Sequence, residues 1–400
     1  MQVDTDTTND EVLLAATNHD LEALKKLLRT GSARIQDPDT GFSPLHAAIA
    51  ACEPDDESKE ESAPAGDAVH GNALTEESAL ATVQLLFENG AIWNELDNND
   101  ETPGCLALRL GLKNVYEAVV AAGVRAELLF NRLDEYAPLP DGGEDEEMED
   151  EEITGFEPSP ADVPDTSENG ELSNPNVDNP AYLASKLTYS EGRLLDSDKN
   201  AVMMDWETEI MKCSADQLCP KKGLRTMNIG HGMGIVDRMF MENEPEMHYI
   251  VEAHPEVLQH IRNTGWYEKK NVRVCEGRWQ DVLPKLVAEG VVLDAMYYDT
   301  YAEDYKDLKE LFSEYVIQLL DNNGKFGFYN GLGADRQICY DVYTKVVEIE
   351  LFDAGLDVEW TTLQVPSLVG AWDGIRRPYW TVPEYRLPTC KFIGQTAGAP

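Results

Sequence analysis

The 400-residue sequence lacks the features that mark membrane-spanning or secreted proteins. No apolar run approaches the ~20 residues that a helix needs to cross a bilayer. Residues 1–11 are polar and acidic, without the basic and apolar regions of a secretory signal. None of the seven cysteines stands in a C-x-x-C pair, so reduced thiols are expected rather than disulfides or a zinc site. We therefore expect a protein of the cytoplasm or the nucleus that makes no membrane contact.

Basic residues are scarce as well. The chain has 32 Lys and Arg against 75 Asp and Glu, which gives a formal net charge of −43. Residues 1–179 are the more acidic part, with 9 Lys and Arg against 41 Asp and Glu. Such a field repels phosphate backbones, which argues against direct nucleic-acid binding. It attracts a basic partner, but the same acidity also serves solubility, and composition leaves both interpretations open.

The longest stretch without a basic residue lies between Arg132 and Lys186. Eight of the nine residues 144–152 are acidic, and Pro, Ser, Asn and Gly follow them. Self-repulsion and low hydrophobicity predict a disordered linker in this region. The chain then divides into a module at 1–133, a linker at 134–180 and a second domain at 181–400.

The N-terminal module contains an internal repeat. Three positions recur 59 residues later and one recurs after 33, as Gly31/Gly90, Gly41/Asp100, Pro44/Pro103 and Gly90/Gly123. A period of 33 residues is typical of ankyrin repeats, and an insertion at about 53–78 accounts for the difference. The segment Ser43-Pro44-Leu45-His46-Ala47-Ala48 is similar to the start of an ankyrin unit, in which His46 is structural. We expect a small all-α ankyrin-repeat module whose units are stable only when stacked.

Strand and helix patterns alternate after the linker. Strands are expected at residues 226–229, 248–251, 272–274, 291–298 and 325–329, with later ones near 358–365 and 379–382. Helices are expected from Ile235 and around 311–320, whereas no long helix separates the last two strands. This order predicts an α/β fold with an open, doubly wound, Rossmann-like sheet that ends in an antiparallel hairpin.

A glycine-rich turn follows the first of these strands. Gly230, Gly232 and Gly234 open a helix, and glycines there let the backbone approach a ligand closely. Glu252 ends the second strand, where its carboxylate can accept hydrogen bonds from two ribose hydroxyls. A solvated surface acid is the alternative interpretation of Glu252. Together the turn and the acid indicate a nucleotide-containing cofactor but do not separate NAD from S-adenosylmethionine.

Two further features favour the methyl donor. The turn is G-x-G-x-G rather than G-x-G-x-x-G, so it need not bind a pyrophosphate. The fourth strand runs through apolar residues into Tyr298-Asp299-Thr300-Tyr301, at the edge of the sheet where ligands bind. A carboxylate at Asp299 is costly unless it meets a cation. A guanidinium is a suitable cation because it binds carboxylates in bidentate fashion.

Five segments carry a specific resemblance: residues 202–208, 230–235, 248–252, 277–282 and 298–301. In this order and spacing, residues 185–400 resemble guanidinoacetate methyltransferase. With the repeat module and the acidic linker, the whole architecture is similar to the fungal type IV protein arginine methyltransferases, which modify the delta nitrogen. A small-molecule guanidino methyltransferase and a non-catalytic ankyrin adaptor remain alternatives. An NAD-dependent oxidoreductase is disfavoured because a second mononucleotide-binding half is missing.

The resemblance implies a site for S-adenosylmethionine, released as S-adenosylhomocysteine, and no metal. The residues that it implies for this site are Tyr189, Met203, Met211, Gly230, His231, Gly232, Met233, Gly234, Ile235, Glu252, Ala253, His254, Arg278, Trp279 and Asp299. In this set the backbone of 230–235 would hold the methionine part and Glu252 the ribose. Arg278 and Trp279 would bracket the adenine. Met203, Met211 and Trp279 are equally compatible with ordinary core positions.

The resemblance also implies that Asp299 and Glu207 are catalytic residues that bind the acceptor guanidinium. Without the resemblance, Glu207 would be interpreted as an acid on the surface of a helix. Asp299 is the better candidate base because it ends a central strand. Methyltransferases of terminal arginine nitrogens carry a paired-glutamate loop and a Thr-His-Trp loop, and neither occurs here. The acceptor implied is therefore the delta nitrogen of arginine. The implied partner is a basic protein, by resemblance a ribosomal protein, and we expect the enzyme to be a monomer.

Overall fold

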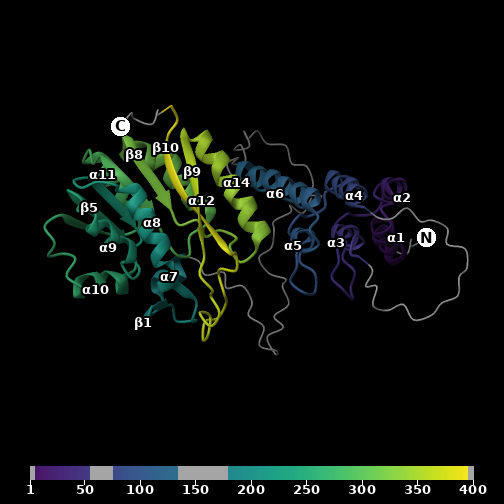
Figure 1. Ribbon diagram of the computed structural model, residues 1–400, viewed down its shortest axis with the longest axis horizontal. Coiled ribbons are helices and arrows are strands. Elements are labelled where there is room, and N and C mark those ends of the chain that lie inside the picture. Colours follow the sequence, from purple (N-terminus) through teal and green to yellow (C-terminus); the bar gives the residue numbers. More distant parts are fainter. Residues whose placement is uncertain (1–4, 55–74, 134–178, 395–400) are drawn as a thin grey trace, which may run out of the picture.

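The structure, a computed structural model, describes residues 5–54, 75–133 and 179–394 (Figure 1). Most of the predicted insertion and of the predicted linker lies outside the described residues, so the insertion and the disorder expected of the linker stay predictions. Two helices overlap the ends of these predicted segments. Helix α4 (Glu76–Glu88) begins inside the predicted insertion, and helix α7 (Asn179–Ala184) begins inside the predicted linker.

The described part of the N-terminal module consists of three consecutive helix pairs. They are α1 (Thr5–Thr17) with α2 (Leu21–Leu27), α3 (Pro44–Ala50) with α4, and α5 (Pro103–Arg109) with α6 (Lys113–Leu133). Both α3 and α5 begin with a proline, whose fixed φ suits a first helical turn. Gly41 and Asp100, which the repeat makes equivalent, both adopt a positive φ, of 73° and 60°. This match supports the repeat, and the ankyrin assignment itself stays a prediction.

His46 joins two units of the module. Its ring is buried, and Nδ1 accepts a hydrogen bond from the backbone N–H of Ser43 at 3.2 Å. Nε2 lies 3.1 Å from the carbonyl oxygen of Glu101, to which it donates in that tautomer. The side chain therefore ties the start of α3 to the turn before α5, as a structural residue does.

Seven strands of the C-terminal domain form one mixed sheet. They are β4 (Arg225–Ile229), β5 (Met247–Glu252), β6 (Val272–Glu276), β7 (Leu293–Tyr298), β8 (Leu320–Phe328), β9 (Leu356–Gln364) and β10 (Glu384–Phe392). Their order is β6-β5-β4-β7-β8-β10-β9. Strands β4 to β8 pair in parallel, whereas β10 is antiparallel to both β8 and β9. Because β4 pairs with both β5 and β7, the chain reverses its direction of winding there, which is where such sheets bind ligands.

One predicted strand is wrong. Residues 379–382 form a loop, and β10 begins only at Glu384. Pro378 and Pro383 flank the loop, and proline cannot donate a hydrogen bond to a strand ladder. The apolar pattern there has another cause, since the buried ring of Trp380 packs in the core and its Nε1 donates to Val382 O at 2.6 Å.

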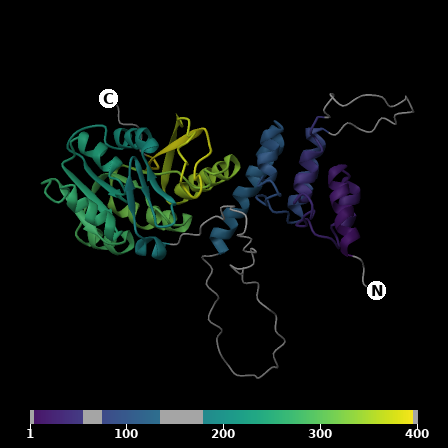
Figure 2. The same cartoon turned by 90° about the horizontal axis from the view of Figure 1, so that it is seen from below.

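Helices cover both faces of the sheet (Figures 1 and 2). One face packs against α8 (Thr208–Leu218), α9 (Ile235–Glu242) and α10 (Pro255–Asn263). The other packs against α11 (Trp279–Ala288), η3 (Leu311–Val316) and α14 (Gln337–Asp353). The helix predicted around 311–320 is present and runs without interruption through α12 (Tyr305–Glu310), the π-helical segment η3 and α13 (Ile317–Leu319), after which β8 begins. Among the described helices, none combines the length and the apolar character that a membrane span requires.

A small sheet that the sequence did not predict precedes α8. Its strands are β1 (Thr188–Ser190), β2 (Arg193–Leu195) and β3 (Ala201–Met204), and the short helix η2 (Asp205–Glu207) follows. Strand β3 brings Met203 onto the glycine-rich turn. A Cβ added to Gly232 would lie 2.8 Å from the Cε atom of Met203. The small sheet therefore closes one side of the crevice above β4.

The repeat module and the C-terminal domain share an apolar core along α14. Ile338, Val342 and Val346 are fully buried in the same cluster as residues of the module. The contact is close because glycines face α14. A Cβ on Gly104 of α5 would lie 2.5 Å from Ile338, and one on Gly123 of α6 would lie 2.7 Å from Val342. The two parts of the chain are thus packed together at one end of the sheet, where α6 runs beside α14 (Figure 1).

Candidate active site

The glycine-rich turn is shaped by contact with the loop after β7. Gly230 has a φ of +92°, and a Cβ there would lie 1.9 Å from the carbonyl oxygen of Asp299. Any side chain at this position would therefore force the two loops apart. Gly234, the residue before α9, also has a left-handed backbone, and its missing side chain makes room for the ring of His231. The turn can take this path only with glycine at these positions.

The carboxylate of Glu252 is held by backbone amides at the end of β5. Its Oε2 accepts from the N–H of His231 at 2.8 Å, and Oε1 accepts from Ala253 at 2.8 Å and His254 at 2.7 Å. The side chain is 7% exposed, and it lines a cavity. Since each carboxylate oxygen has two lone pairs, Oε2 retains one for a ligand hydroxyl, whereas Oε1 already accepts two hydrogen bonds.

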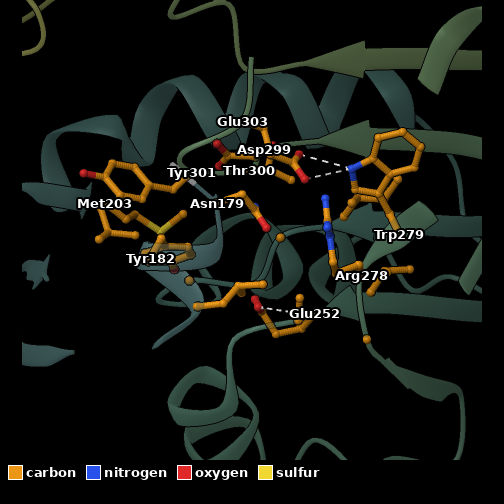
Figure 3. A pocket seen from close by; sticks show the side chains of 18 residues that line it. Asn179, Tyr182, Met203, Glu252, Arg278, Trp279, Asp299, Thr300, Tyr301 and Glu303 are labelled. Atoms are coloured by element: carbon orange, nitrogen blue, oxygen red, sulfur yellow. Dashed lines mark hydrogen bonds between the residues drawn. The ribbon is translucent and has the colours of Figure 1, made fainter. Parts of the chain in front are cut away.

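This first cavity lies between Glu252 and the loop after β7 (Figure 3). It brings together eight residues of the predicted cofactor set: Met203, Gly230, Gly232, Glu252, Ala253, Arg278, Trp279 and Asp299. In Figure 3, Glu252 lies on one side of the cavity, and Trp279, Asp299 and Glu303 lie on the other. The exposed guanidinium of Arg278 forms no ion pair or hydrogen bond with the residues that the structure describes, so it is available to a ligand.

The other predicted cofactor residues surround the cavity without lining it. They are Tyr189, Met211, His231, Met233, Gly234, Ile235 and His254. Met211 and Ile235 are buried in the core between α8, α9 and the sheet. Tyr189 of β1 donates to the carbonyl of Gly232 at 3.2 Å, and the N–H of Met233 lies 3.3 Å from the sulfur of Met203. Their placement favours support of the turn over direct contact with a ligand.

His254 and Tyr182 connect the cavity to α7. The Nε2 atom of His254 lies 3.0 Å from the carbonyl oxygen of Tyr182, and the two rings are 4.8 Å apart. Tyr182 and Asn179 line the first cavity, although the sequence analysis did not identify either of them. Helix α7 begins at the end of the predicted linker and has only six residues, so no periodic pattern could have revealed it.

A buried polar network lies beneath the turn. Asp237 of α9 accepts from His231 Nδ1 at 2.7 Å, from His248 Nε2 at 2.8 Å and from Asn228 Nδ2 at 3.0 Å. The same amide of Asn228 donates to the carbonyl of Gly230 at 2.7 Å. Burial alone would raise the pKa of Asp237, but the two histidines outweigh it and hold the pKa below its usual range. The network fixes the turn to β4, β5 and α9 at once.

Asp299 separates the first cavity from a second one. It directly follows β7, is half-buried, and lines both cavities. Its Oδ2 atom has no hydrogen-bond partner among the described residues. Burial, together with the carboxylates of Glu207 and Asp237, raises the pKa of Asp299 well above its usual range. An unpaired buried carboxyl of this kind is costly unless a cation binds to it.

Glu207 faces the second cavity from the end of η2. Its Oε1 accepts from the phenols of Tyr379 at 2.6 Å and Tyr329 at 3.0 Å, and Oε2 accepts from the N–H of Met204 at 3.1 Å. Burial raises the pKa of Glu207 to about 7, against the lowering effect of these hydrogen bonds. The two predicted catalytic residues therefore share the second cavity, and neither carboxyl group forms an ion pair with the residues that the structure describes.

Glu303 is a carboxylate of this region that the sequence analysis missed. It lines both cavities and accepts from Trp279 Nε1 at 3.0 Å and from Tyr298 OH at 2.5 Å. Its position four residues after Asp299, in the same strand-end loop, was the signal available in the sequence. Trp279 is both a core residue and a wall of the first cavity, so the two interpretations of it are compatible.

Comparison with known proteins agrees with these features. The model of the guanidinoacetate N-methyltransferase family matches residues 181–352. A protein of Aspergillus fumigatus named protein arginine N-methyltransferase 2 is 53% identical over 413 residues, which cover 97% of each chain. Proteins of the same name are 51% identical in Emericella nidulans, over 98% of each chain, and 47% identical in Neurospora crassa, over 96% of this chain and 95% of that protein.

Solved structures are more distant. An O-methyltransferase from Streptomyces achromogenes, in complex with SAM, is 14% identical with a TM-score of 0.35, covering 46% of this chain and 80% of that one. That likeness is too weak to argue from, whereas the sequence relatives match over almost their whole length. On the strength of those relatives, this chain belongs to the protein arginine N-methyltransferase 2 family.

Proposed function

We propose that this protein transfers the methyl group of S-adenosylmethionine to the delta nitrogen of an arginine side chain in a basic protein. The observation that carries the proposal is the position of Asp299, which stands between two cavities and whose buried Oδ2 atom has no hydrogen-bond partner among the residues that the structure describes. The names of the relatives, which specify protein arginine, support the acceptor class.

The residues of the first cavity fit the methyl donor. Gly230 and Gly232 let Asp299 and Met203 approach the turn closely at the edge of this cavity, and Glu252 presents a fixed carboxylate to a ribose. Arg278 and Trp279 stand where they could bracket an adenine. When bound, S-adenosylmethionine would supply an electrophilic methyl group on a sulfonium. The chain's own contribution is to orient that methyl group toward the second cavity and to exclude water.

The residues of the second cavity fit a guanidinium. A cation between Asp299 and Glu207 would lower both raised pKa values, because each charged carboxylate would then have a partner. Tyr329 and Tyr379 fix the direction of the Glu207 carboxylate. Two carboxylates at the terminal nitrogens would localise positive charge there, so the delta nitrogen regains its lone pair for attack.

Asp299 is the proposed base. A free guanidinium has a pKa above ~12, so its nitrogens are poor nucleophiles in water. As the new carbon–nitrogen bond forms and the carbon–sulfur bond breaks, the delta nitrogen must lose its proton, and Asp299 is in place to accept it. Holding donor and acceptor in line contributes several kcal/mol to the rate in well-oriented reactions of this kind.

The delta nitrogen is inferred from the resemblance to guanidinoacetate methyltransferase and from the absence of two loops from the sequence. Guanidinoacetate is methylated on the nitrogen that bears its carbon chain, and the loops typical of terminal-nitrogen enzymes do not occur in the sequence. A ribosomal substrate, residence in the cytoplasm or nucleus, and a monomeric state are proposed on the same resemblance. The net charge of −43 supports a basic partner.

The test is to incubate the full chain with methyl-labelled S-adenosylmethionine and a fungal cell lysate. The labelled protein is then hydrolysed and its arginine derivatives are identified by mass fragmentation. We expect delta-methylarginine in a basic protein and no label with the Asp299→Asn variant. Label on a terminal nitrogen would refute the delta assignment, and label only in small molecules would favour a guanidino-metabolite methyltransferase. If no label is transferred and calorimetry detects no binding of S-adenosylhomocysteine, the non-catalytic ankyrin adaptor is the interpretation that remains.

A further inference from the structure

Helix α14 contacts the repeat module with one side and the second cavity with another. Ile338, Val342 and Val346 are buried against α5 and α6. Tyr343 and Val347, on the same helix, line the second cavity. A shift of α14 relative to the sheet would therefore move a wall of the proposed acceptor site.

Tyr343 belongs to both the cavity and the module interface. Its phenol donates to the Oε2 atom of Glu127, in α6, at 3.3 Å. Both side chains are half-buried, which strengthens a hydrogen bond to a carboxylate relative to one in water. Glu127 is thus a residue of the repeat module that holds the direction of a cavity-lining side chain.

A second polar contact lies further along the same interface. The phenol of Tyr116, in α6, donates to Asp341 of α14 at 2.5 Å, and Asp341 also pairs with Arg386 of β10 at 2.5 Å. The module, α14 and the sheet are therefore tied by one chain of hydrogen bonds. This chain fixes the rotation of α14 about its own axis.

The floor of the second cavity depends on α14 as well. Asn330 lines the cavity, and its amide donates to Tyr340 OH at 3.2 Å and to Thr344 Oγ1 at 3.4 Å. Both partners are on α14. Two walls of the cavity thus depend on where the repeat module holds this helix.

We propose that the repeat module shapes the acceptor site through α14, with Glu127 as a positioning residue that acts on Tyr343. The inference rests on the proposed function, because it identifies the second cavity as the guanidinium site. A module that only docked the protein substrate would act at a distance and would leave a minimal acceptor unaffected. A module that shapes the cavity changes the binding of an acceptor too small to reach the module.

The experiment uses the full chain and arginine capped at both ends, N-acetylarginine methylamide, as the acceptor. We expect Glu127→Ala to raise the KM for this probe about three- to tenfold, the range for one lost hydrogen bond, with S-adenosylhomocysteine affinity unchanged. Glu127→Gln keeps an acceptor oxygen and should recover most of the loss. Glu117→Ala is the matched control, since Glu117 is 62% exposed on the same helix, and it should leave the KM at the wild-type value.

Tyr343→Phe should raise the KM as Glu127→Ala does, and the double variant should cost less than the sum of the two. Wild-type KM in the Glu127→Ala enzyme would overturn the inference while leaving the proposed function intact. Labelling of lysate protein without any turnover of the capped arginine would also overturn it, because recognition would then lie outside the cavity. Failure of the wild type to label either acceptor would instead refute the proposed function.

Discussion

Asp299 and Glu207 illustrate how a buried carboxyl group indicates its missing partner. One oxygen of Asp299 has no hydrogen-bond partner among the described residues, and both groups have raised pKa values. Glu207 differs because three donors hold it, including two phenols. The two groups should therefore have unequal roles: Glu207 is a fixed anchor, and Asp299 is the group free to take a proton.

The first prediction tests that role. Asp299→Asn keeps the shape of the side chain but removes its charge and its ability to accept a proton. Methyl transfer measured in single turnovers should fall by ~10²-fold or more, the loss expected for a general base. S-adenosylhomocysteine affinity should stay near the wild-type value, which serves as the control for folding.

Glu207→Gln should lower methyl transfer similarly, and the loss in the double variant should be smaller than the sum of the two single losses because both residues hold one guanidinium. Full turnover in the Asp299→Asn enzyme would contradict the mechanism.

The second prediction concerns pH. Burial raises the pKa of Glu207 to about 7, so the carboxyl is protonated in the free protein below that pH. A guanidinium binds the ionised form, and its own pKa lies above ~12. The contribution of Glu207 to the KM for the acceptor should therefore lower it by up to about tenfold per unit as pH rises from 6 to 7, and should level off above 7. Glu207→Gln should flatten the Glu207 component of this profile. A KM that is independent of pH between 6 and 8 in the wild type would argue against the assignment.

At the scale of elements, the turn between β4 and α9 is fixed from two sides. Above it, the missing side chain of Gly230 admits the carbonyl of Asp299. Below it, Asp237 joins His231 in the turn to His248 in β5, whose other ring nitrogen lies 2.7 Å from Thr226 Oγ1. A turn held in this way keeps its backbone in place for a ligand without the ligand being bound.

The third prediction tests the network below the turn. Asp237→Asn removes a buried negative charge that accepts from two histidines, and leaves donors without an adequate partner. The free energy of unfolding in urea should fall by about 3–5 kcal/mol, the cost of breaking a buried pair. Asp353→Asn, at an exposed position on α14, should change it by less than about 0.5 kcal/mol. If Asp237→Asn and Asp353→Asn had the same free energy of unfolding, the negative charge of Asp237 would make no net contribution to stability.

At the scale of the whole molecule, the acidic linker suggests two independent domains, but the shared core along α14 does not. Removing the repeat module would expose Ile338, Val342 and Val346, each of which is 0% exposed in the full chain. A fully buried aliphatic side chain of this kind contributes about 1.5–3 kcal/mol. The module is therefore part of what stabilises the C-terminal domain.

The fourth prediction follows from this shared core. The described parts should unfold in one calorimetric transition in the full chain, and a chain lacking residues 1–133 should unfold at a lower temperature. Replacing Ile338, Val342 and Val346 by Thr in the shortened chain should restore its solubility but not its stability. An unchanged unfolding temperature in the shortened chain would show that the two parts are thermodynamically independent.

Much of the candidate site was predictable because its signals are local. The glycine turn, Glu252 and Asp299 each lie where a strand ends, and a strand–turn–helix pattern is visible in a few consecutive residues. The first cavity does contain eight of the predicted cofactor residues. The roles assigned to them stay predictions. The strand expected at 379–382 was wrong because an apolar pattern can equally mark a loop whose side chains pack in the core.

The sequence by itself determined the α/β order and the residues at the strand ends, on the edge where sheets of this kind bind ligands, since these depend on neighbours along the chain. Only the tertiary structure placed Tyr379 against Glu207, 172 residues away, and Glu127 against Tyr343, 216 residues away. Such contacts arise when separate elements pack, and no periodicity in either segment identifies its partner. For the same reason the acidic linker indicated a separation, whereas burial of apolar side chains on α14 joined the two parts.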